Sequence, residues 1–127
     1  MNPYTRHVLR RSGRPELTAL VEAWDAVEAL VIRVYRGGSA GPGDETEYRR
    51  LQSAVRIELG PWRDELAPLW RSATIGGKPA EHDPFDAVLG RPSAAAFVAD
   101  WAAMQTLPAA RQALNSLIVQ SPAERGS

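Results

Sequence analysis

The chain has 127 residues, 15 of them basic and 15 acidic, so its net charge is zero and self-repulsion does not oppose the collapse of the chain into a folded domain. It contains no cysteine, which excludes disulfide scaffolds, thiol catalysis and cysteine-ligated zinc. No apolar run approaches the roughly 20 residues that cross a membrane, and MNPYTRHVLRRSG lacks the apolar core of a secretory signal. We therefore expect no membrane association and a cytoplasmic location.

Composition favours helices within a single domain. A chain of this length forms one domain, and its 20 alanines are strong helix formers. Several of the ten prolines precede helix-compatible stretches and several of the ten glycines follow them, as at helix starts and ends. We predict an all-α fold, an irregular bundle of five to six helices over residues 1–120, with a frayed tail over 121–127.

The clearest helical pattern covers residues 15–36. Its apolar residues alternate at spacings of three and four, which places them on one face of a helix. They are Leu17, Leu20, Trp24, Val27, Val31 and Val34. The GGSAGPG segment that follows predicts a loop.

A second long helix is predicted over residues 45–72. Asp44 and Glu47 have the spacing of a capping box at its start. The apolar stripe keeps its helical phase through Gly60 and Pro61, which favours one helix kinked at Pro61. A break at Gly60, with Pro61 starting a new helix, is the alternative.

The last third of the chain predicts three more helices. Residues 72–83 read as irregular, and Asp83 is the expected N-cap of a short helix in DPFDAVLG. A helix over 92–105 is apolar on two sides, and its tryptophan, like the other three, is expected in the core. If a strip of this helix were exposed, it would form a surface for a partner or a second copy. A final helix covers 108–119.

Glu28 is the outstanding candidate for a ligand site. At 100° per residue it falls within the apolar arc of the 15–36 helix, beside Trp24. A carboxylate there must be paired or reach solvent, or it serves a function, as a general acid or base or as the anchor of a ligand. The structural alternatives are an arginine of the 45–72 helix, a hydrogen bond with Tyr48, or a side chain that extends to solvent.

Nucleic-acid binding is a second possibility. Residues 92–119 have the proportions of a helix-turn-helix, and its second helix carries base-reading residue types at Arg111, Gln112 and Asn115. A basic N-terminal arm adds Arg6, Arg10, Arg11 and Arg14. Since the whole chain is neutral, the remainder carries a charge of −4, which disfavours phosphate binding.

Other chemistry finds little support. The chain has two histidines, His7 and His82, and neither follows a glutamate at the spacing of carboxylate-bridged metal sites, so we expect no metal and no cofactor. The segments DPFDAVLG and LPAARQALN resemble segments of small bacterial helical proteins, but they contain no motif that identifies a family. By elimination, the favoured function is non-enzymatic binding of a protein partner or a second copy, with DNA binding and a small-ligand pocket at Glu28 as alternatives.

Overall fold

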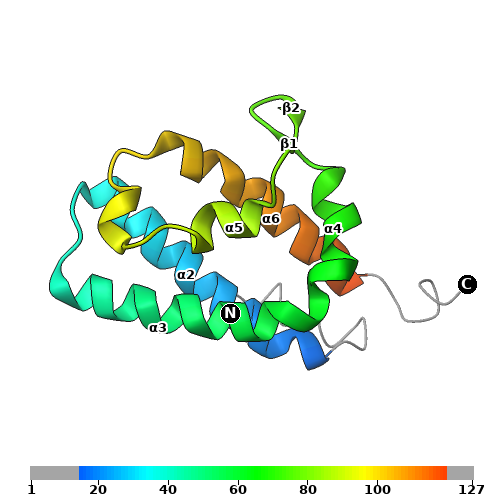
Figure 1. Ribbon diagram of the computed structural model, residues 1–127, viewed down its shortest axis with the longest axis horizontal. Coiled ribbons are helices and arrows are strands. Elements are labelled where there is room, and N and C mark those ends of the chain that lie inside the picture. Colours follow the sequence, from blue (N-terminus) through cyan, green and yellow to red (C-terminus); the bar gives the residue numbers. More distant parts are fainter. Residues whose placement is uncertain (1–14, 120–127) are drawn as a thin grey trace, which may run out of the picture.

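The computed structural model describes residues 15–119, in which helices enclose a common core and one small hairpin projects from them (Figure 1). In chain order the elements are the 3-10 turn η1 (Pro15–Leu17), α2 (Thr18–Gly37), α3 (Pro42–Leu59), the 3-10 turn η2 (Gly60–Trp62), α4 (Arg63–Arg71), strands β1 (Thr74–Ile75) and β2 (Lys78–Pro79), α5 (Pro84–Leu89), the 3-10 turn η3 (Ala94–Phe97) and α6 (Trp101–Val119). The all-α class is confirmed. The basic arm and the 121–127 tail lie outside the described residues.

Helix α2 follows the prediction closely. All six residues of its predicted apolar stripe are buried. The chain leaves the helix at Gly38, whose φ of 74° is left-handed and whose N–H donates to the Val34 carbonyl at 3.0 Å. Glycine adopts this conformation without the steric cost of a Cβ, which explains why the helix stops there.

Helix α3 begins three residues before the predicted start. Pro42 occupies its first turn, where the missing N–H has no helical partner to lose. The Asp44 carboxylate accepts the Gly41 N–H at 2.9 Å and the Arg33 guanidinium at 2.6 Å. These hydrogen bonds, that from Arg33 above all, lower the pKa of Asp44. Asp44 therefore caps from inside the first turn rather than preceding the helix.

The predicted 45–72 helix is divided in two. The 3-10 turn η2 separates α3 from α4, and Figure 1 shows α4 leaving at a steep angle to α3. Pro61 has no N–H to donate to the Ile57 carbonyl, so a regular α-helix cannot continue unchanged through it. The break at Gly60 describes the chain better than one kinked helix, although the apolar stripe is buried on both sides of it.

The stretch predicted as irregular contains a hairpin. Strands β1 and β2 pair in antiparallel register, and the two residues between them, Gly76 and Gly77, have φ of 60° and 82°. Positive φ at both central positions is the geometry of the tightest hairpin turn, for which Gly-Gly is a known signal. After the hairpin, Asp83 caps α5 as predicted, accepting the Phe85 N–H at 2.8 Å. Burial raises the pKa of this Asp83 carboxyl.

The predicted helix over 92–105 is wrong. Residues Ala94–Phe97 form only a 3-10 turn, and Ala99 then takes a left-handed φ of 58°. Asp100 starts a new helix by accepting the Ala103 N–H at 3.1 Å, and it pairs with Arg91 at 3.0 Å. Helix α6 then runs unbroken to Val119 and includes Pro108. Pro108 is exposed, and its missing N–H deprives only one carbonyl of a partner.

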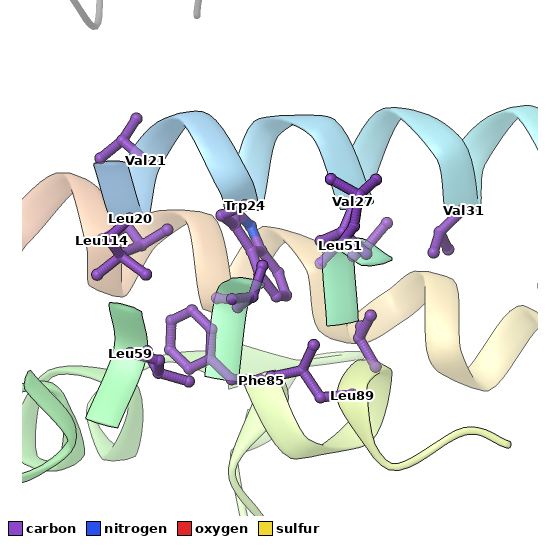
Figure 2. Packing of buried hydrophobic residues seen from close by; sticks show 14 of the residues in the cluster. Leu20, Val21, Trp24, Val27, Val31, Leu51, Leu59, Phe85, Leu89 and Leu114 are labelled. Carbon is purple, nitrogen blue, oxygen red and sulfur yellow. The ribbon is translucent and has the colours of Figure 1, made fainter. Parts of the chain in front are cut away.

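The core joins α2, α3, α4, α5 and α6. Trp24 lies at its centre with no exposed surface, and its ring meets Phe85 edge-to-face with centroids 5.0 Å apart (Figure 2). Leu51 and Leu59 of α3 and Leu114 of α6 pack around this pair. In the part of the chain that is described, no helix is long and apolar enough to cross a bilayer.

A polar stripe on α3 holds the end of α5. The Tyr48 hydroxyl lies 2.8 Å from the Val88 carbonyl, and the Gln52 amide donates to the Leu89 carbonyl at 2.6 Å. Arg56 donates to the same Leu89 carbonyl at 2.7 Å. Gln52 and Arg56 thus satisfy the Leu89 carbonyl at the C-terminal end of α5, whereas the Val88 carbonyl also accepts the Arg91 N–H at 3.3 Å. Burial raises the pKa of Tyr48 to about 12.

Replacing Tyr48 by phenylalanine should lower the free energy of unfolding by about 1 kcal/mol at neutral pH, because the buried hydrogen bond between the Tyr48 hydroxyl and the Val88 carbonyl is lost. Tyrosine ionises near pH 10 in the unfolded chain, so the stability that buried neutral Tyr48 contributes falls as the pH rises from about 10 toward 12. Urea unfolding at pH 7 and about pH 11 should show the two proteins converging. An equal gap at both pH values would contradict this account.

Candidate functional site

The strongest candidate site is a groove between α2 and α6. The two helices run in opposite directions (Figure 1). Glu28 of α2 therefore meets Arg111 of α6, and Tyr35 meets Trp101. The groove encloses about 380 Å³. Its lining residues are Glu28, Ile32, Tyr35, Arg36, Trp101, Met104, Leu107, Pro108 and Arg111. We call it the α2–α6 groove.

The walls of the α2–α6 groove are mostly apolar and include an exposed tryptophan. Trp101 is 61% exposed at the first residue of α6. Its ring centroid lies 6.3 Å from that of Tyr35, at a tilt of 37°. Ile32 and Met104 line the groove between its ends and are only half-buried. A tryptophan left in water beside a hollow is the kind of anchor that protein interfaces bury.

One end of the groove carries a cluster of three charged side chains. The Arg111 guanidinium pairs with Asp25 and lies 3.1 Å from Glu28. Each of the three side chains is only about a fifth exposed. Arg111 Nη1 and Asp25 Oδ2 are buried and have no hydrogen-bond partner in the structure. Two carboxylates and one guanidinium give this acidic cluster a formal charge of −1.

The other end of the groove carries a single cation. Arg36 is exposed, and it forms no ion pair with any residue between 15 and 119. It lies two helical turns beyond Glu28, a distance of about 12 Å along α2. The α2–α6 groove is therefore apolar in the middle, negative at one end and positive at the other.

The structure brings together two residues that were predicted for separate sites. Glu28 lies in the groove, and its partner is Arg111 of α6 rather than an arginine of the 45–72 region or Tyr48. Trp24 does not reach the groove lining, because it is fully buried against Phe85, and its Nε1 has no hydrogen-bond partner. The predicted ligand pair Glu28 and Trp24 therefore faces two different environments.

Residues 92–119 do not form the predicted helix-turn-helix. The turn predicted at Gln105–Leu107 lies inside the continuous helix α6, and Arg111 is held by two carboxylates instead of facing solvent. Gln112 and Asn115 are exposed and line a shallow hollow with Ser116 and Val119. The basic arm that would accompany them lies outside the described residues.

Sequence reasoning missed Trp101, Tyr35 and Arg36 as site residues. Trp101 was expected in the core because it falls on an apolar face of the predicted 92–105 helix. The available signal was the second apolar face of that segment, which suggested an exposed strip. With α6 starting at Trp101, the tryptophan occupies a helix end at the surface instead of a helix middle.

Among residues 15–119 no three histidine, aspartate or glutamate side chains are grouped so as to hold a metal ion. Comparisons of the chain with protein-family models, with curated proteins and with solved structures gave no match.

Proposed function

We propose that this protein is a non-enzymatic binding domain that contacts a protein partner, or a second copy of itself, through the α2–α6 groove. The observation that carries the proposal is Trp101, 61% exposed on the wall of an apolar hollow of about 380 Å³. Burying one tryptophan removes a large apolar area from water, and such residues contribute much of the binding energy of interfaces.

The charges of the groove favour binding over catalysis. Glu28 is the carboxylate among the lining residues, and it is paired with Arg111, which also pairs with Asp25 behind the lining. A general base needs a carboxylate that is free to take a substrate proton, whereas the Glu28 carboxylate is already paired with the Arg111 guanidinium at 3.1 Å. The same ion pairs link α2 to α6 at one end of the groove.

Photo-crosslinking tests this proposal at a single position. Benzoylphenylalanine placed at position 101 in the full chain should give a discrete adduct with a protein on irradiation in cells. The matched control is position 57, because Ile57 is 73% exposed on α3, outside the groove lining. Adducts from position 101 and none from position 57 support the groove as the interface. Absence of adducts from 101, or equal adducts from both, would contradict it.

A further inference from the structure

We propose that the occupant of the α2–α6 groove is the same groove of a second copy, in a two-fold symmetric dimer. The inference rests on the proposed function and specifies its partner. It begins from the distribution of charge, since the acidic cluster and Arg36 lie at opposite ends of one apolar hollow.

Two-fold symmetry can make such a groove complementary to itself. In a symmetric dimer the same surface patch is used by both subunits, so residue i meets residue j while j meets i. Consider a two-fold axis that lies in the interface and crosses the long direction of the groove at its middle, near Ile32. The two grooves then face each other and run in opposite directions. Arg36 of one protomer then approaches the partner's Glu28, and the reverse contact forms at the other end.

The same arrangement places Trp101 of each protomer over the groove of the other protomer. On α6 the middle of the groove lies near residue 106, halfway between Trp101 and Arg111. Trp101 of one protomer therefore lies over the partner's Pro108 and the partner's Arg111. Proline offers an apolar surface for the indole ring, and a guanidinium over an indole face adds a cation–π attraction. Each copy thus supplies the group that closes the groove of the other.

The opposite choice of axis is less favourable. An axis along the groove would place equal ends together, so that the two acidic clusters would meet and the two Arg36 side chains would meet. Like charges brought together at an interface oppose binding, whereas opposite charges fix the orientation of the partner. The charge pattern therefore selects the arrangement in which the grooves run in opposite directions.

Sedimentation equilibrium of the purified full chain tests this proposal. Because the groove is small, we expect a monomer–dimer equilibrium with a Kd on the order of 10–100 µM. Trp101→Ala should weaken the dimer by at least about 30-fold, the effect of truncating an interface anchor. Arg36→Glu should weaken it several-fold, and raising the salt from about 50 mM to about 500 mM should do the same to the unchanged protein.

Matched controls separate the groove from general surface effects. Ile57→Ala removes an exposed apolar side chain elsewhere, and Arg49→Glu reverses an exposed charge on α3; both should leave the dimer unchanged. Circular dichroism confirms that each variant is folded. A chain that stays monomeric at about 500 µM, well above the expected Kd, overturns the dimer. An equal weakening of the dimer by the two control substitutions overturns it as well. A position-101 adduct with the mass of another protein would retain the proposed function while rejecting self-association.

Discussion

Trp24→Ala is expected to lower the free energy of unfolding by about 3–5 kcal/mol, the largest effect of any substitution considered for this fold. The side chain has no exposed surface and packs edge-to-face on Phe85, so truncation leaves a cavity between α2 and α5. Urea unfolding followed by circular dichroism measures the change. A domain of this size has a stability of only about 5–15 kcal/mol, so the shift in midpoint should be large.

Two further variants identify the cause of the Trp24→Ala effect. Trp101→Ala removes the same side chain from a position that is 61% exposed, and it should change monomer stability by no more than about 0.5 kcal/mol. Trp24→Phe should cost less than Trp24→Ala, because Trp24 Nε1 has no hydrogen-bond partner and only volume is lost. Equal destabilisation by the two alanine substitutions would show that Trp24 is not the centre of the core.

Arg111→Met is expected to lower the free energy of unfolding by about 2 kcal/mol. Exposed ion pairs contribute about 0–1 kcal/mol, whereas breaking a buried pair costs about 3–5 kcal/mol, and side chains about one-fifth exposed fall between these limits. The substitution keeps much of the apolar volume but leaves Asp25 and Glu28 near each other without their cation. The same urea unfolding measurement applies.

The triple variant Asp25→Asn, Glu28→Gln, Arg111→Met should recover most of the loss, because no unpaired charge remains. Arg50→Met is the matched control: it breaks a solvent-exposed pair with Glu47 on α3 and should leave the free energy of unfolding nearly unchanged. If the triple variant is as unstable as Arg111→Met alone, the loss comes from packing of the arginine side chain and the electrostatic account is wrong.

The periodicity of the sequence was sufficient to predict α2 and its buried face, because the apolar residues on the buried face of an amphipathic helix recur at spacings of three and four. It was not sufficient for the region after Arg91. There the break depends on a left-handed Ala99 and on the Asp100 carboxylate capping α6, and alanine gives no sequence signal for such a conformation. The same pattern of apolar residues fits a helix through 92–105 equally well.

The candidate site is formed by contacts between residues of two different helices, and the periodicity of either helix alone does not predict such contacts. Helical periodicity marks Glu28 as a carboxylate that needs a partner, but its partner Arg111 lies 83 residues away and is a residue type that also reads bases. Only the antiparallel packing of α2 on α6 brings them together. In the same way, the groove exists because Trp101 begins α6 beside Tyr35, so an error in one helix boundary concealed the site.

The most direct measurement of the proposed interface is site-directed disulfide formation, for which the chain offers a background without cysteine. Ala29 and Arg36 lie seven residues apart on the same side of α2, and both are exposed. In the antiparallel dimer, position 29 of one protomer lies near position 36 of its partner. Mild oxidation of an equal mixture of Ala29→Cys and Arg36→Cys chains should therefore give the mixed disulfide-linked dimer in excess over either self-linked dimer. A mixture of Arg36→Cys with Ile57→Cys should not. If the 29–36 mixture gives no more linked dimer than the 36–57 mixture, two copies do not meet through the α2–α6 groove.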